Sequence, residues 1–296
     1  MANTIQKYLD TLKKELKGSD SATIQDALID AEEHLTTALE ALSEEQPELD
    51  ESEALRQIIE QYGTPEETAV AYIEVERRTF PELGSTSKVK GQSVFGRFFG
   101  VYADPRAWGS LFYMLIAFVT GVAYFSWAVT GISVSISFAL FIFGLPVAFL
   151  FLLSVRGLAW LEGRLVEALL GVRMPRRSLL PPKGGKLLER IKLLLLDKHT
   201  WFSIIYMLLQ FVLGTVYFVV LVTILSLSLS GIAIPILQEV FHEPVVQSYA
   251  TRYYLPQWGY PLVVIAGILL WTGTMHLIRW VGSLHGKYAK ALLVTE

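Results

Sequence analysis

The chain has 296 residues, of which 52% are hydrophobic and only 18% are charged, and it contains no cysteine. Ordinary soluble domains carry about 25% charged residues, so this composition favours a membrane protein and excludes a disordered chain. The lack of cysteine excludes disulfides, thiolate metal sites and cysteine nucleophiles. Residues 1–78 hold 7 Lys or Arg and 19 Asp or Glu, whereas the remainder holds 18 and 9. An acidic, soluble head therefore precedes a basic, apolar body.

The head is predicted to be a small helical bundle. Apolar residues recur at helical spacing within residues 5–16, 24–42 and 55–62. Thr64, Pro65 and Glu67 follow, in the pattern of an N-cap, a first-turn proline and a capping box. This pattern predicts a fourth helix, which begins at residue 65.

Two motifs of the head suggest a family. A glutamate-rich helix contains Glu32-Glu33-His34-Leu35, and the capped helix start reads Gly63-Thr64-Pro65-Glu66-Glu67. Together they resemble the HAAS-type helical signalling domains of bacteria, over about a quarter of the chain. The resemblance implies a non-catalytic domain that accompanies bacterial sensors or transcription regulators. His34 allows a metal or phosphoacceptor interpretation, and the alternative is an ordinary histidine on the helix surface.

The body contains four runs without Asp, Glu, Lys or Arg that are long enough to cross a bilayer. They cover residues 108–129, 133–155, 201–238 and 253–278. Gly231 and Pro235 are expected to end or bend the third helix. No carboxylate is expected inside a span, and Gln210 is the strongly polar side chain expected well within one.

Basic residues indicate how the spans are oriented. The segment 156–198, between the second and third spans, holds ten Lys or Arg, and cytoplasmic loops are enriched in these residues. The linker 79–106 and the tail after the fourth span are also basic. We therefore expect both chain ends in the cytoplasm and the body in a bacterial inner membrane.

The body also repeats itself. Residues 104–125 and 197–218 are identical at eleven of 22 positions, with a constant offset of 93. A second block, residues 156–170, recurs at 279–293 with an offset of 123. Each repeat holds two spans, so both should cross the membrane in the same direction. Residues expected to support packing of the repeats are Trp108, Gly121, Trp201 and Gly214.

Further motifs in the body suggest a second family. They are the start Asp104-Pro105-Arg106-Ala107-Trp108 and the basic exit helix with Arg156, Leu161-Glu162-Gly163-Arg164 and Leu169-Leu170-Gly171. These motifs resemble the bacterial sensor membrane domain that precedes histidine-kinase modules, over about two-thirds of the chain. Only a short basic helix is expected after the fourth span, without a nucleotide-binding glycine box. The resemblance therefore implies that output passes to another chain or through the head.

A first group of candidate site residues lies in the basic loop, beside an amphipathic stretch at residues 185–197. These residues could bind the acidic head or anionic lipid headgroups, and the alternative is a topology signal without a specific partner. Nucleic acid is not expected as a partner, because aromatic residues are absent from 173–192. The group comprises Arg173, Arg176, Arg177, Lys183 and Lys186.

A second group lies in the external segment between the third and fourth spans: Glu239, His242, Glu243 and Arg252. Glu239 and His242 are spaced to share one helix face. This spacing allows a metal site or a pH-sensing histidine, and the alternative is a solvated cap over the spans. No metal or other cofactor is predicted, because a di-metal bundle needs a second such motif.

The sequence thus predicts an all-α protein with a helical domain at 1–78, a linker at 79–106 and a transmembrane domain at 107–296. The transmembrane domain would consist of two parallel two-span repeats, about 104–173 and 197–296. We expect a membrane sensor that signals through its head to a cytoplasmic kinase or transcription regulator, with a homodimer as a further option. The alternative is a transport or lipid-handling protein with a regulatory head. Catalytic motifs are absent, so an enzyme is not expected.

Overall fold

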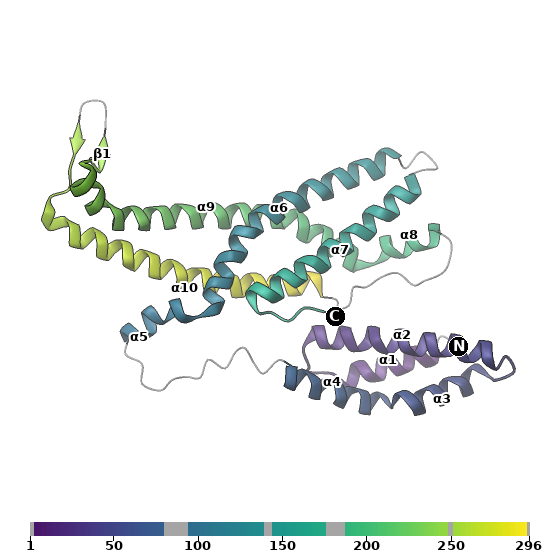
Figure 1. Ribbon diagram of the computed structural model, residues 1–296. Helices are drawn as coiled ribbons and strands as arrows, with labels where there is room; N and C mark the ends of the chain where they lie inside the picture. The colour runs from purple at the N-terminus through teal and green to yellow at the C-terminus, as the bar shows by residue number, and fades with distance from the viewer. Residues whose placement is uncertain (1–2, 80–93, 139–143, 176–186, 248–250, 295–296) are drawn as a thin grey trace.

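The computed structural model describes residues 3–79, 94–138, 144–175, 187–247 and 251–294. They form a helical head and a body of long helices, and the head lies against one end of the body (Figure 1). Arg176, Arg177, Lys183 and Lys186, which were predicted to bind the head or lipid, lie outside the described residues.

Four helices make up the described head: α1 (Asn3–Glu15), α2 (Ser21–Glu45), α3 (Glu51–Tyr62) and α4 (Pro65–Thr79). Asp20 and Asp50 cap α2 and α3, since each side chain accepts a hydrogen bond from the backbone N–H two residues later. The predicted capping box is confirmed. The Thr64 N–H donates to Glu67 Oε2 at 2.9 Å, and the Glu67 N–H donates to Thr64 Oγ1 at 3.3 Å.

The head has a hydrophobic core of its own. The Tyr8 hydroxyl joins α1 to the start of α4, since it donates to the Gly63 carbonyl at 2.9 Å and lies 3.0 Å from Thr68 Oγ1. Burial raises the pKa of Tyr8. His34 is exposed and stacks on Tyr62, with ring centroids 4.4 Å apart. The core consists of Tyr8, Leu12, Leu16, Ala27, Ala31, Leu35, Leu55, Ile58 and Ala69.

The body contains four helices that are long and apolar enough to cross a membrane: α6 (Pro105–Phe138), α7 (Gly144–Leu170), α9 (Lys198–Phe241) and α10 (Tyr260–Leu293). Large apolar side chains are exposed along all four, as lipid-facing surfaces require. The chain is therefore a multi-pass membrane protein. The short helix α5 (Val94–Phe99) and the 3₁₀ turn η1 (Gly100–Ala103) precede α6.

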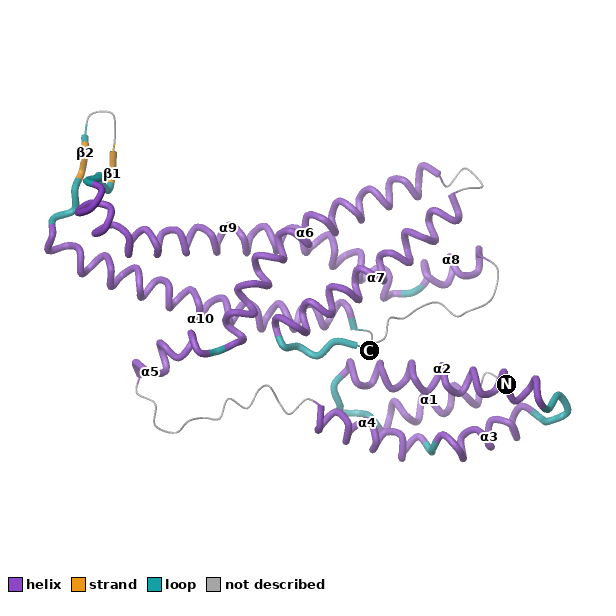
Figure 2. Tube along the Cα trace, viewed as in Figure 1, coloured by secondary structure: helices purple, strands orange, loops and turns teal. Residues whose placement is uncertain are grey.

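Helices α6 and α9 cross at the centre of the body, with α7 packed along α6 and α10 along α9 (Figure 1). The helix α8 (Leu187–Leu196) packs on α7 and α9 through Ile191 and Leu194, whereas Leu188 and Leu196 are exposed. A hairpin of β1 (Val246–Gln247) and β2 (Arg252–Tyr253), followed by the turn η2 (Gln257–Gly259), joins α9 to α10. This hairpin lies at the end of the body that faces away from the head (Figure 2).

Helix ends differ from the sequence prediction in two places. The first long helix continues to Phe138, because the serines after residue 132 bond to carbonyls within the helix, as Ser133 Oγ does to Val129 O at 2.8 Å. The second begins at Gly144, after the predicted start at residue 133, and continues through the predicted exit helix to Leu170. Helix α9 runs through Gly231 and Pro235 without ending.

Candidate functional site

The crossing of α6 and α9 depends on two glycines. A Cβ atom added to Gly121 would lie 2.7 Å from the carbonyl oxygen of Gln210, and one added to Gly214 would lie 2.2 Å from that of Ala117. Small residues allow such close backbone approach in membrane helices. The glycines therefore set the distance at which the polar side chains of the two helices meet.

A carboxylate lies buried beside this crossing, which corrects the expectation that no span holds one. Glu162 of α7 is 1% exposed. Its Oε1 accepts hydrogen bonds from the hydroxyls of Tyr113 at 2.6 Å and Tyr206 at 2.9 Å, and its Oε2 accepts one from Tyr124 at 3.0 Å. Gln210 Nε2 donates to the Tyr113 hydroxyl at 3.2 Å. Burying a carboxylate is costly unless donors converge on it in this way.

His285 of α10 lies on the other side of the same tyrosines and is 2% exposed. Its Nε2 is 2.7 Å from the Tyr113 hydroxyl and 3.2 Å from the Tyr206 hydroxyl, and its Nδ1 is 3.2 Å from the Tyr217 hydroxyl. The polar cluster, as we call this group, consists of Tyr113, Tyr124, Glu162, Tyr206, Gln210, Tyr217 and His285.

The polar cluster joins positions that the two sequence offsets relate. Tyr113 and Tyr206 differ by 93, as do Tyr124 and Tyr217, while Glu162 and His285 differ by 123. Phenylalanines at related positions also stack across α6 and α9, with centroids of Phe118 and Phe218 4.7 Å apart and those of Phe125 and Phe211 4.8 Å apart.

Four members of the polar cluster lie at one level of the body, near the end that faces the head. Tyr113 and Tyr206 each lie eight residues after the start of their helix, and Glu162 and His285 each lie eight residues before the end of theirs. At roughly 1.5 Å per residue, this level is about 12 Å from the helix ends. A change in the hydrogen bonds of these residues would therefore take place close to the head.

Counting protons shows what the cluster can do chemically. Three hydroxyl donors on one carboxyl group fit an ionised Glu162, which only accepts hydrogen bonds. The oxygens of Tyr113 and Tyr206 can then accept the Nε2–H of His285. The Tyr217 hydroxyl can donate to Nδ1 of a neutral His285 or accept from Nδ1–H of a protonated one. The cluster can therefore take up one proton while every contact between heavy atoms is kept.

Two ion pairs connect the helix pairs at the same end. Arg156 of α7 pairs with Asp197, which caps α9. Arg279 of α10 pairs with Asp104, which precedes α6, at 3.0 Å. Each arginine thus binds the aspartate at the start of the other helix pair. These bonds hold the ends of the four helices together around the polar cluster.

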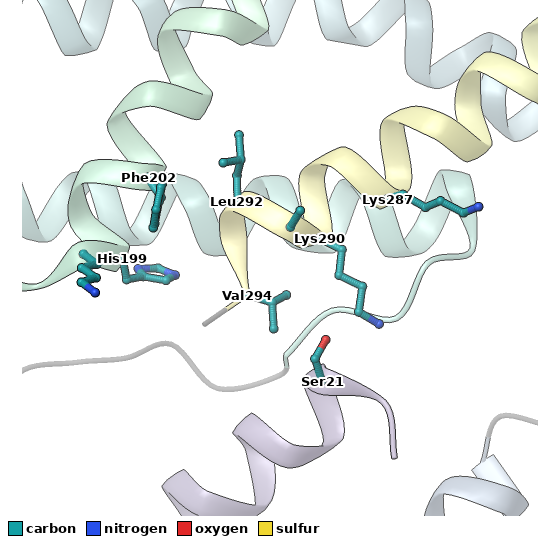
Figure 3. A pocket seen from close by; sticks show the side chains of 9 residues that line it. Ser21, His199, Phe202, Lys287, Lys290, Leu292 and Val294 are labelled. Carbon is teal, nitrogen blue, oxygen red and sulfur yellow. The ribbon is translucent and has the colours of Figure 1, made fainter. Parts of the chain in front are cut away.

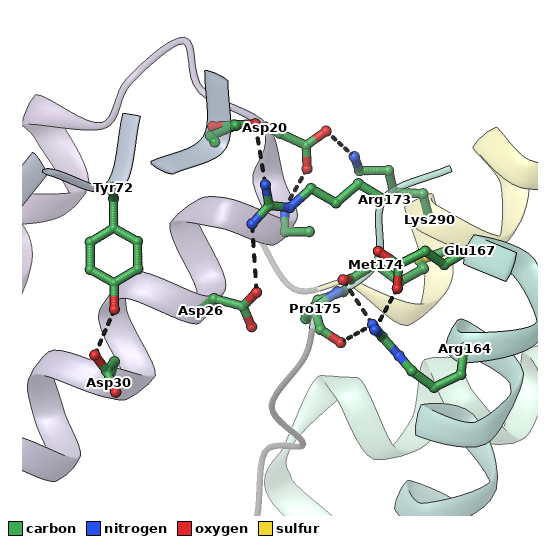
Figure 4. A network of polar contacts seen from close by, with 12 residues as sticks. Asp20, Asp26, Asp30, Tyr72, Arg164, Glu167, Arg173, Met174, Pro175 and Lys290 are labelled. Carbon is green, nitrogen blue, oxygen red and sulfur yellow. Dashed lines mark hydrogen bonds and ion pairs between the residues drawn. The ribbon is translucent and has the colours of Figure 1, made fainter. Parts of the chain in front are cut away.

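The head is bound by two basic residues of the body (Figure 4). Lys290 of α10 pairs with Asp20, the cap of α2. Arg173, just after α7, lies 3.9 Å from Asp26 and 3.7 Å from Glu76 of the head. These contacts join the acidic head to the basic body, and Arg173 is one of the residues that the sequence singled out.

The segment that carries Arg173 is itself held in place (Figure 4). Arg164 of α7 donates to the carbonyl oxygens of Met174 at 2.8 Å and Pro175 at 2.5 Å. Met174 is 1% exposed and packs in one cluster with Tyr113 and Tyr206. Arg173 is therefore positioned by a segment that packs in the same hydrophobic cluster as two tyrosines of the polar cluster.

The external residues lie in the hairpin region, far from the polar cluster. Glu239 accepts hydrogen bonds from Gln257 at 3.3 Å and Tyr260 at 3.0 Å. His242 follows the end of α9 with a φ of 55°, so the helix face that it was expected to share with Glu239 stops before it. His242, Glu243 and Arg252 are exposed. Within the described residues, no three His, Asp or Glu side chains are grouped to hold a metal.

The two tryptophans predicted to support packing lie at the surface instead. Trp108 is 39% and Trp201 is 51% exposed. Their indole N–H groups donate to backbone carbonyls six residues earlier, in Tyr102 at 2.9 Å and Leu195 at 2.8 Å. Such positions suit the membrane interface, whereas close helix packing involves Gly121 and Gly214.

Comparison with known families concerns the body. The family described as "Sensor: Putative sensor" matches residues 113–293, which is more than half of the chain. The chain belongs to this family. The region that matches the Sensor family contains the whole polar cluster and both crossing glycines. No curated protein and no solved structure matches the chain. The matched region begins after the head, whose resemblance to HAAS-type domains stays a prediction.

The polar cluster was missed because its members look ordinary one at a time. Glu162 lies in a segment assigned to the basic loop, and His285 in one assigned to the tail. A usable signal was nevertheless present in the sequence. The offset of 123 aligns Glu162 with His285, so two ionisable residues occupy equivalent positions of a repeat whose tyrosines also align.

Proposed function

We propose that this member of the Sensor family is a membrane sensor that controls a cytoplasmic partner through the position of its helical head. One observation carries the proposal: the helices that hold the ionisable groups of the polar cluster also hold the head. Glu162 lies on α7, whose end leads to Arg173, and His285 lies on α10, five residues before Lys290. A movement of α7 relative to α10 would change the spacing of both contacts to the head.

The proposed mechanism needs only small movements. Met174 and Leu293 pack in the hydrophobic cluster that contains Tyr113 and Tyr206. A stimulus that alters the hydrogen bonds of the polar cluster would therefore shift the segments next to Arg173 and Lys290. The acidic head would then be held less firmly, and its surface would become available to a kinase or a transcription regulator. Such a switch requires a difference of only a few kcal/mol between two states.

We further propose that the body consists of two parallel two-span repeats in a bacterial inner membrane, with the head and both chain ends in the cytoplasm. The reciprocal ion pairs of Arg156 with Asp197 and Arg279 with Asp104 support related repeats, because they involve equivalent positions. The ten Lys or Arg of residues 156–198 support the orientation. In this proposal the protein has no catalytic activity of its own.

Engineered cysteines offer a direct test, since the chain has none of its own. Spin labels at Thr37 in α2 and Lys192 in α8, which are both exposed, report the distance between head and body. We expect a narrow distance distribution at low salt and a broader one at high salt, because screening weakens exposed ion pairs. The Arg173→Gln, Lys290→Gln double variant should show the broad distribution at low salt as well.

The control removes two exposed lysines that do not face the body, Lys13 and Lys14 of α1, and should keep the narrow distribution. If the Arg173 and Lys290 double variant also kept it, docking of the head by these ion pairs would be wrong. His285→Gln tests the route from the polar cluster. If this variant folds but leaves the distribution unchanged, the head does not respond to the cluster.

Transport is the second candidate function, and it requires a substrate path between the two helix pairs. At the level of the polar cluster, this space is filled by Tyr113, Tyr206 and Gln210 in mutual contact, and Gln210 is fully buried. The close approach at Gly121 and Gly214 lies next to it. A packed crossing of this kind favours the sensor over a transporter.

A further inference from the structure

A pocket of about 580 Å³ lies between the head and the body (Figure 3). The body supplies most of its walls, from the first residues of α9 and the last residues of α10, and the head contributes Ser21 of α2. The volume is within the range typical of small-molecule sites. Lys287 lies two residues and Lys290 five residues after His285 on α10, so the pocket adjoins the polar cluster, but none of its lining residues is a member of the cluster.

The pocket is strongly basic. Lys198, Lys287 and Lys290 line it, and the lining residues that the structure describes include no carboxylate. Within the described part of the chain, the acidic partner of these lysines is Asp20, which pairs with Lys290. Lys198 and Lys287 are exposed. Three lysines that line one pocket supply the positive charge that a phosphate group requires.

Besides the lysines, Ser21 and His199, the wall of the pocket is apolar. Phe202 and Leu292 line the pocket. On α9, Phe202 is 43% exposed, and Ile205, three residues further into the apolar part of the helix, is also 43% exposed. A free phosphate would use only the lysines, whereas a lipid could place its phosphate at the lysines and its chains along this apolar surface.

We propose that this pocket binds the phosphate-bearing headgroup of an anionic lipid. Basic pockets at the ends of membrane helices provide the charge that such headgroups require. The bound phosphate would share Lys290 with Asp20 and would therefore compete with the head for that lysine. The idea that the lipid acts as a stimulus rests on the head docking proposed above. The binding of the lipid to the pocket does not depend on that proposal.

The test is titration calorimetry of the full chain in detergent with short-chain phosphatidylglycerol, phosphatidylcholine or inorganic phosphate. Phosphatidylglycerol should bind, and the Lys198→Gln, Lys287→Gln double variant should bind it about 30-fold more weakly, since each lysine near an anionic headgroup contributes about 1 kcal/mol. The Lys13→Gln, Lys14→Gln variant has the same change in charge away from the pocket and should bind like the unaltered chain. Lys198→Arg with Lys287→Arg keeps the charge and should retain binding.

Each other outcome contradicts the proposal at a defined point. The site would be overturned if the Lys198→Gln, Lys287→Gln variant bound phosphatidylglycerol as tightly as the unaltered chain does. It would also be overturned if phosphatidylcholine bound as tightly as phosphatidylglycerol. If inorganic phosphate bound as tightly as phosphatidylglycerol, the proposal that the ligand is a lipid would be wrong, and the ligand would be a free oxyanion. Arg173→Gln, which loosens the head outside the pocket, should leave lipid binding intact even if head docking fails its own test.

Discussion

Replacing Tyr113 with Phe removes a single oxygen from the centre of the polar cluster. This oxygen lies 2.6 Å from Glu162, 2.7 Å from His285, 3.2 Å from Gln210 and 3.3 Å from Tyr206. Hydrogen bonds between membrane helices contribute about 0.6 kcal/mol each on average, so four contacts amount to about 2 kcal/mol. A buried carboxylate without its closest donor adds about 1–3 kcal/mol. We expect Tyr113→Phe to lower the free energy of unfolding by about 3–5 kcal/mol.

The matched control is Tyr124→Phe, because the Tyr124 hydroxyl contacts the cluster through one bond, to Glu162 at 3.0 Å. Its expected cost is about 1 kcal/mol. Unfolding of the full chain in detergent can be followed by tryptophan fluorescence, which reports on the body alone because all seven tryptophans lie after residue 107. Equal losses of stability in the two variants would refute the inference that Tyr113 is the centre of the cluster.

Three further predictions concern other parts of the molecule. Gly214→Ala should lower the unfolding midpoint, since the added Cβ would lie 2.2 Å from a backbone oxygen, whereas Gly157→Ala, with nothing within 4 Å, should leave it unchanged. Asp197→Asn should cost about 3–5 kcal/mol and Asp104→Asn about 1 kcal/mol or less in denaturant unfolding, because their arginine partners are 7% and 40% exposed. Burial raises the pKa of Tyr8, so its contribution to stability is present below about pH 10 and is lost as the pH rises further. Tyr8→Phe should weaken this pH dependence, measured as hydrogen exchange of α1 amides in the full chain.

The fold could be predicted wherever short-range patterns determine it. The capping box of Thr64 and Glu67 identifies the start of α4 from four residues, and long uncharged runs locate the four membrane helices. The end of α7 at Leu170 agrees with the exit helix that the sequence predicts, but the unbroken continuation of the second span through Arg156 could not be predicted in this way. Charged residues such as Arg156 usually end a span, but here Asp197, 41 residues away and 32% exposed, pairs with the charge. Only the tertiary structure reveals such a partner.

The candidate site was less predictable than the fold for the same reason. The sequence identified Gly121, Gly214 and Arg173, since close helix packing and charge complementarity leave local signals. It did not identify Glu162 or His285, because their roles depend on which helix faces bring tyrosines next to them. An ionisable residue near a helix end is usually solvated, and its burial follows from helix pairing and not from its own sequence neighbourhood.

Glu162 and His285, whose positions are related by the offset of 123, are different residues, and identical residues there would be unfavourable. Tyr113 and Tyr206 meet with their oxygens 3.3 Å apart, and each needs both an acceptor and a donor. Glu162 supplies the acceptor and His285 the donor, whereas two glutamates would repel each other and two histidines would remove the carboxylate acceptor. We therefore expect Glu162→His and His285→Glu each to destabilise the body, and the exchange of both residues to recover part of the loss. A double-mutant cycle of unfolding free energies measures this coupling. If the double variant lost as much stability as the two single variants together, the opposite roles of Glu162 and His285 would not explain why these two positions hold different residues.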